Sequence, residues 1–325
     1  MSLYVEDWQA SYGSPYLIVP EAPTDTRATL VEDGDTLRAH RGEPAGAPRV
    51  AFVDGVRRVE ASLYRVDDGD GSIARGVAGA HACGAVLVGE RTDGPPTFGR
   101  VQVARHVIFG SGQTGTLPAV TGGWTWHTAS VADPDPDAPL AELQRRMRQA
   151  EGLLAEQLCA EGWFTVVDGP LSFVRSTDLP VVGYVKTHHR MLLDAAEHAA
   201  VPALVGLGAR TSLFAHADRY STYVRIADAD RHAGPWSGIV RLESPQSTGL
   251  SSAVRTADAV TGFLPSFAGV RHRDPRAPQN LQPVGALEKH LRHQLGSPAL
   301  AVRAVRDAVA QLRPAARPAK EVMAP

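Results

Sequence analysis

The chain has 325 residues, 43% of them hydrophobic, with a net charge of −2 and an isoelectric point of about 6.6. The length and apolar fraction are typical of a globular protein and predict a sizeable core. The near-zero net charge argues against a basic protein that coats nucleic acid non-specifically, so any nucleic-acid surface must be local.

The two cysteines, Cys83 and Cys159, lie far apart in apolar stretches. Their spacing argues against a disulfide framework or a zinc site and favours a reducing environment. No stretch reaches the roughly 18 consecutive apolar residues of a membrane span, and the N-terminus lacks the basic and apolar pattern of a signal peptide. We therefore expect a soluble, cytoplasmic protein with no membrane partner.

The first part of the chain, residues 1–48, is polar and rich in proline. This composition predicts an N-terminal arm, suited to docking a partner, rather than a folded domain. Three strand patterns follow, over residues 49–66, 72–90 and 98–110. Because the turn-forming sequences DDGDG and RTDGPPT separate them, they predict an antiparallel meander.

A loop, TGGWTWHTASVADPDPDAP, leads into a helix predicted over about residues 138–161. Two more strands follow, WFTVVDGPL at 163–171 and LPVVGYVKTH at 179–188. Three antiparallel strands, a crossover helix and two strands that can run parallel to the first predict an α/β fold. Its centre is a mixed five-stranded sheet with flanking helices.

The remainder of the domain predicts a helix, two further strands within 210–228 and 236–245, and a long helical region from about residue 283. We expect these elements to extend the same domain, which then spans residues 49–312. The tail, residues 313–325, is rich in proline and alanine and is expected to be mobile.

Two aspartates share one pattern, an apolar run followed by Asp-Gly: Asp54 in RVAFVDGVRR and Asp168 in FTVVDGPL. A buried carboxylate costs several kcal/mol unless it is paired, hydrogen-bonded or bound to a metal. If the two strands are parallel neighbours, the carboxylates lie roughly 5 Å apart and repel each other. A divalent cation between them is the simplest compensation. For either aspartate alone, an ordinary turn is the alternative.

The predicted crossover helix supplies a third acid. At about 100° per residue, Glu151 lies beside the apolar stripe of this helix, whereas Glu142 and Glu156 lie on the far face. Asp54, Glu151 and Asp168 would then form an all-oxygen cluster, which selects Mg²⁺ or Mn²⁺. Paired metals at such a site support attack of water on a phosphodiester.

These features together resemble the NurA nuclease family of the ribonuclease H-like superfamily. The resembling pieces are FVDGV, the helix with Glu151, VVDGPL, VGYVKTHHR, YVRI followed by VRLESP, and PVGALEKH, over about residues 50–295. The resemblance implies a deoxyribonuclease with two Mn²⁺ or Mg²⁺ ions that processes DNA ends as an exonuclease and can cut single strands internally. It also implies a homodimer that works with a hexameric HerA-like ATPase.

The resemblance implies roles for individual residues. Asp54, Glu151 and Asp168 match the family's metal-binding acids. Lys186 matches a lysine near the scissile phosphate. The late helix would bring Glu288 as a further metal ligand or His290 as a proton-handling group.

Two alternatives stay open. Val56 and Pro170 stand where the family commonly has serine after Asp-Gly. Together with the lack of net positive charge, they leave a catalytically silent NurA-like adaptor that docks DNA or a motor ATPase. Another ribonuclease H-like enzyme, RNA-cleaving or transposase-like, is the other alternative, because the sequence does not separate DNA from RNA.

Overall fold

The computed structural model describes residues 2–5, 27–42, 49–67, 69, 71–89, 94–174, 180–188, 191–228 and 233–312. In these residues the fold is α/β, as predicted: one mixed sheet of thirteen strands with helices on both faces. Most of the predicted arm and the whole predicted tail lie outside the described residues. No described helix is long and apolar enough to cross a membrane.

The elements are as follows. The strands are β1 (Ser2–Val5), β2 (Thr29–Leu30), β3 (Ala39–Arg41), β4 (Val50–Val66), β5 (Ile73–Val88), β6 (Thr97–Phe109), β7 (His127–Ser130), β8 (Phe164–Asp168), β9 (Val181–Val185), β10 (Ala209–Thr211), β11 (Phe214–His216), β12 (Arg219–Arg225) and β13 (Ile239–Pro245). The helices are α1 (Ala138–Ala160), α2 (Ala195–Ala200), α3 (Leu250–Phe263), α4 (Gln282–Gln294) and α5 (Pro298–Leu312), with short 3-10 helices at Val201–Ala203, Gln246–Thr248 and Leu264–Phe267.

The predicted meander is confirmed: β4 pairs antiparallel with β5, and β5 with β6. The predicted parallel strands are confirmed as well, because β8 lies parallel to β4 and β9 parallel to β8. The strands from the meander to the parallel pair therefore stand in the order β6-β5-β4-β8-β9. Beyond β9 the sheet continues antiparallel through β13, β12 and β11.

Two parts of the C-terminal half differ from the prediction. Residues 210–228, predicted as one strand, contribute to three, β10, β11 and β12, of which β11 and β12 form a hairpin. Helix α3 was not predicted. Residues 27–42, predicted as part of the arm, carry β2 and β3, which pair with β11 and β10 at the end of the sheet.

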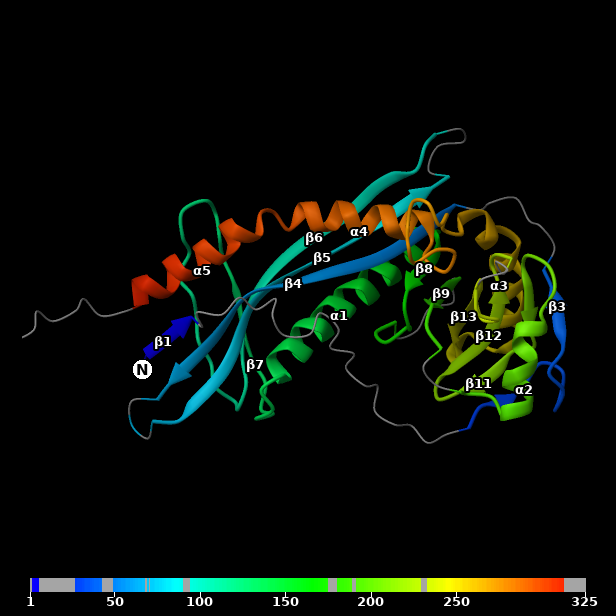
Figure 1. Ribbon diagram of the computed structural model, residues 1–325, viewed down its shortest axis with the longest axis horizontal. Helices are drawn as coiled ribbons and strands as arrows, with labels where there is room; N and C mark the ends of the chain where they lie inside the picture. The colour runs from blue at the N-terminus through cyan, green and yellow to red at the C-terminus, as the bar shows by residue number, and fades with distance from the viewer. Residues whose placement is uncertain are drawn as a thin grey trace, which may run out of the picture.

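Helices cover both faces of the sheet where β4 runs through it. Figure 1 shows α4 and α5 along one side of the long strands β4 to β6 and α1 on the other. The first residues of β4 are buried on both faces, which is why they read as a continuous apolar run. Val50 and Phe52 belong to the core cluster that contains residues of α4, whereas Ala51 and Val53 belong to the cluster that contains residues of α1.

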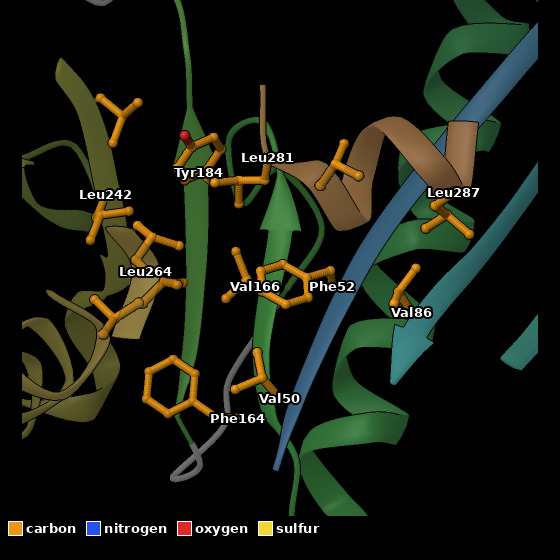
Figure 2. Close-up of a cluster of buried hydrophobic side chains, with 14 of the residues drawn as sticks. Val50, Phe52, Val86, Phe164, Val166, Tyr184, Leu242, Leu264, Leu281 and Leu287 are labelled. Carbon is orange, nitrogen blue, oxygen red and sulfur yellow. The ribbon is translucent and has the colours of Figure 1, made fainter. Parts of the chain in front are cut away.

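The core on the α4 side is the larger of these two clusters. Its side chains come from the central strands and from α4, as Figure 2 shows for Phe52, Val166, Tyr184 and Leu287. This core fixes α4 against the strands that carry Asp54 and Asp168.

Candidate metal centre

Asp54 and Asp168 lie side by side on neighbouring parallel strands. The pairing of β4 with β8 runs from Val50 opposite Phe164 to Val53 opposite Val167, and the two aspartates follow directly. Successive side chains of a strand point to opposite faces, and Val53 and Val167 both belong to the cluster with α1. Both aspartates therefore point to the α4 side of the sheet.

Helix α4 adds a third carboxylate on that side. Glu288 is 7% exposed and follows Leu287, which packs in the core. One carboxylate oxygen from each of Asp54, Asp168 and Glu288 lies within 4.8 Å of the other two. We refer to these three residues as the central acidic group.

Two positively charged side chains, Lys186 and Arg276, bind two of the three carboxylates in the central acidic group. Lys186 Nζ, just after β9, donates to Asp168 Oδ2 at 2.7 Å and to Asn280 Oδ1 at 2.9 Å. Arg276 donates to both oxygens of Glu288, at 2.7 and 2.8 Å. Both contacts neutralise acids at the edge of the group.

Other oxygens of the group have no such partner. Asp54 is 5% exposed and makes no hydrogen bond or ion pair with another described residue. Asp168 Oδ1 is buried and also lacks a partner in the described structure. Burial raises the pKa of Asp54 well above its ordinary value, and the charges of Asp168 and Glu151 raise it further against the attraction of Lys186.

Glu151 faces the sheet, as predicted, and is 1% exposed, but it lies on α1 and is not a member of the central acidic group. Arg148 Nη1 donates to Glu151 Oε2 at 2.9 Å and to the Asp168 carbonyl oxygen at 2.8 Å. Glu151 Oε1 is buried without a partner. Burial raises the pKa of Glu151 to about 7, although Arg148 works to lower it.

The glycine in each Asp-Gly pair has a physical reason. A Cβ added to Gly55 would overlap the carboxylate of Glu151, so only glycine lets α1 come this close to β4. Gly169 has a φ of +96°, and an added Cβ would come 2.9 Å from Arg148 Nη1. Neither Asp-Gly pair is thus an ordinary surface turn: Gly55 lies inside β4, and Gly169 follows the last residue of β8.

Three other residues singled out in the sequence, His290, Val56 and Pro170, are not members of the central acidic group. His290 is two residues beyond Glu288, which turns it about 200° around α4. Its ring stacks on Phe98, with centroids 4.3 Å apart, and it does not belong to the central acidic group. Val56, where the family commonly has serine, packs in the core on the α4 side. Pro170 is partly exposed.

The prediction for Glu142 on α1 is wrong in one respect, its exposure. The wheel places it on the far face, yet it is only 9% exposed. The reason is local: Arg145 and Arg146, three and four residues further along the helix, bind its carboxylate at 2.5 and 2.8 Å and cover it.

The central acidic group fits a divalent cation. Its donors are carboxylate oxygens, the ligands that Mg²⁺ and Mn²⁺ prefer. Asp168 Oδ1 is buried without a partner among the described residues, and Lys186 is bound to the other oxygen of that carboxylate, so a further cation would have a ligand there. These two residues and Glu288 would hold the ion, and Glu151 adds negative charge from the other side of the sheet.

Four residues of this region were not predicted from the sequence: Arg148, Asp274, Arg276 and Asn280. Arg148 has a detectable signal, because it lies three residues before Glu151 on a predicted helix. The other three lie in the loop before α4, where no periodic pattern marks them.

A scan against protein-family models finds no match for this chain, and a search of curated proteins finds no relative.

Proposed function

We propose that this protein is a metal-dependent nuclease of the ribonuclease H-like type. The observation that carries the proposal is the convergence of Asp54, Asp168 and Glu288 beside Lys186, with Asp168 Oδ1 buried and without a partner among the described residues. A set of carboxylates with an adjacent lysine suits hydrolysis of a phosphodiester, where negative charge develops on the phosphate.

The strand order supports the same class. A meander of three antiparallel strands, a crossover helix and two parallel strands give the order β6-β5-β4-β8-β9, with the acids at the centre. This arrangement suits the five-stranded sheet of the ribonuclease H-like superfamily, and the NurA resemblance of the sequence points in the same direction.

In the proposed reaction, Asp54, Asp168 and Glu288 would hold a Mg²⁺ or Mn²⁺ ion, which would supply Lewis-acid chemistry for water and phosphate oxygens. Lys186 lies 2.7 Å from Asp168, and its ammonium stabilises the charge that develops on the phosphate without being a ligand. Glu151, with its pKa raised to about 7, can hold or release a proton near neutral pH.

The test is hydrolysis of linear single-stranded and double-stranded DNA by the purified protein with Mn²⁺, with Mg²⁺ and with chelator. Nucleotide release that requires the metal supports a nuclease. DNA binding with no release under any of these conditions contradicts it and favours the catalytically silent adaptor. A matched RNA substrate separates DNA-cleaving from RNA-cleaving enzymes.

We further propose that the nuclease acts as a homodimer fed by a HerA-like hexameric ATPase. A net charge of −2 gives little of the counterion-release affinity that basic DNA-binding proteins use. A separate ring-shaped motor would supply DNA at high effective concentration. Duplex degradation with and without the ATPase and ATP is the test, because equally processive degradation by the lone protein at physiological salt contradicts the dependence.

A further inference from the structure

The loop before α4 joins the carboxylates at the two ends of the central acidic group. Lys186, which binds Asp168, also donates to Asn280 Oδ1 at 2.9 Å. Asn280 is 1% exposed, and its amide nitrogen donates to Asp274 Oδ2 at 2.6 Å. Asp274 is thus connected to Lys186 through the buried side chain of Asn280.

The chain of contacts continues from Asp274 to the third acid. Arg276 donates to both oxygens of Asp274, at 3.2 and 3.0 Å. It also donates to both oxygens of Glu288. One guanidinium therefore bridges a loop acid and a residue of the central acidic group.

The loop is anchored at its base. The hydroxyl of Tyr184, a fully buried residue of β9, donates to the Gln279 carbonyl oxygen at 2.6 Å. Arg276, in contrast, has half of its side chain exposed. A guanidinium on a fixed loop, facing solvent beside a candidate metal centre, is well placed to meet a substrate.

We propose that Arg276 is a phosphate-binding residue of this site and that Asp274 and Asn280 position it. The inference rests on the proposed function. When Glu288 exchanges Arg276 for the divalent ion, Asp274 keeps the guanidinium beside the site. The N–H groups that Glu288 releases then form a fork that matches two phosphate oxygens.

The composition of the loop supports an anionic ligand. Arg271, Arg273 and Arg276 lie within six residues, and all three are exposed. In a chain of near-zero net charge, such a local cluster is the kind of surface that binds a nucleic-acid backbone.

The first experiment measures binding of a short single-stranded oligonucleotide by fluorescence anisotropy, with Ca²⁺ in place of Mn²⁺ to limit cleavage. Arg276→Gln should bind about tenfold more weakly and lower the slope of log Kd against log salt by about one. Arg276→Lys keeps the positive charge but lacks the two-pronged guanidinium, so its oligonucleotide affinity should fall between those of Arg276→Gln and the wild type. Arg292→Gln is the matched control, because Arg292 approaches the same Glu288 at 3.8 Å but is 69% exposed, and it should bind like the wild type.

The second experiment measures Mn²⁺ binding by calorimetry without DNA. Arg276→Gln should bind Mn²⁺ roughly threefold more tightly, because the cation that competes for Glu288 is removed. A merely structural role predicts the opposite, since a distorted site binds the ion more weakly. Asp274→Asn should raise KM more than it lowers kcat, because it loosens Arg276 and leaves the carboxylates in place.

Wild-type oligonucleotide affinity in Arg276→Gln, or weaker Mn²⁺ binding by that variant, overturns the inference. Melting temperatures establish that each variant is folded, and if Arg276→Gln is not, Arg276→Lys decides by the same two measurements. If the wild type hydrolyses DNA while Arg276→Gln keeps the wild-type affinities for the oligonucleotide and for Mn²⁺, only the proposed role of Arg276 fails. If the wild type neither binds Mn²⁺ nor hydrolyses nucleic acid, the proposed function fails as well.

Discussion

Among the residues that the structure describes, two groups of side chains could hold a metal ion by the distances between their ligand atoms, and their surroundings differ. One is the central acidic group of Asp54, Asp168 and Glu288, and the other consists of Glu32, Asp33 and His40. We call the second one the edge group, because Glu32 and Asp33 follow β2, and β2 is the end strand of the sheet.

In the edge group every acid is occupied by the protein. Both oxygens of Glu32 accept hydrogen bonds from Arg210 at 2.7 Å, and one also accepts the N–H of Leu213. Asp33 Oδ2 accepts from the Ser212 hydroxyl and lies 2.6 Å from His40 Nε2. No buried oxygen of either acid lacks a partner in the described residues.

The pKa shifts of Glu32 and Asp54 have opposite signs. The pKa of Glu32 is lowered, because hydrogen bonds and the charge of Arg210 outweigh the effect of burial. The pKa of Asp54 is raised, because burial and neighbouring negative charges outweigh the single attraction of Lys186. Proximity of acids alone thus does not define a site: the protein itself binds the acids of the edge group, while Asp168 Oδ1 of the central acidic group is buried without a partner among the described residues.

The largest expected effect is on hydrolysis. Asp54→Asn or Asp168→Asn should lower the rate of DNA cleavage at least about a hundredfold, because each removes a carboxylate that would hold the ion. In chelator, both variants should be as stable as the wild type or more so, because the substitution relieves repulsion between carboxylates. Cleavage rates with Mn²⁺ and melting temperatures with chelator check the two halves of this prediction.

The matched control is Glu32→Gln in the edge group, which should retain the wild-type rate when it is folded. If Asp54→Asn cleaves at full rate, the distinction between the two groups is wrong.

The next effect is on stability and concerns the edge group. Glu32→Gln should destabilise the protein by about 3 kcal/mol, because it removes the bidentate partner of Arg210, which is 1% exposed. Because the pKa of Glu32 is lowered in the folded state, its contribution to the free energy of unfolding depends on pH. The contribution is present above about pH 4.5 and is lost as the pH falls further. Urea unfolding at pH 7 and pH 4 measures it. An equal loss at both pH values would mean that the charge of Glu32 is not the cause.

Divalent ions should stabilise the protein through the central acidic group alone. At a concentration of Mn²⁺ one hundred times the dissociation constant, binding adds about 2.7 kcal/mol to the free energy of unfolding. Asp54→Asn should lose most of this gain, whereas Asp33→Asn should keep it. A thermal shift that disappears in Asp33→Asn and persists in Asp54→Asn would place the ion in the edge group.

The sequence indicated the central acidic group only in part, for physical reasons. Asp54 and Asp168 could be predicted because each ends an apolar run, and the pairing of parallel strands then brings them together. Glu151 followed from the helical period. Glu288 could not be placed from its own surroundings, because its contact with the aspartates depends on how α4 packs across the sheet, so only the family resemblance suggested it.

The edge group shows the same limit more strongly. Residues 1–48 read as a polar arm, yet Glu32 in that segment binds Arg210, 178 positions away. Local composition carries no signal for such a long-range ion pair. The division of residues 210–228 among β10, β11 and β12 escaped prediction, because β10 and β11 have only three residues each, too few to show an alternation of polar and apolar side chains.

The smallest effect concerns Glu151, which supports the central acidic group from α1. Its pKa is raised from 4.5 to about 7 by burial, so its contribution to stability is fully present below pH 4.5 and is lost as the pH rises through 7. In chelator, the free energy of unfolding of Glu151→Gln relative to the wild type should therefore increase by about 2 kcal/mol between pH 5 and pH 7.5.

Only the difference between variant and wild type isolates this effect. His81 and His106 have pKa values lowered to about 4 and about 3 by burial, and they favour the folded state as the pH rises through 6.5. Their contribution is the same in both proteins and cancels. Glu142→Gln is the matched control on α1, because Arg145 and Arg146 hold the pKa of Glu142 low against the effect of burial. Its stability relative to the wild type should not increase over this range, and an increase equal to that of Glu151→Gln would contradict the special position of Glu151.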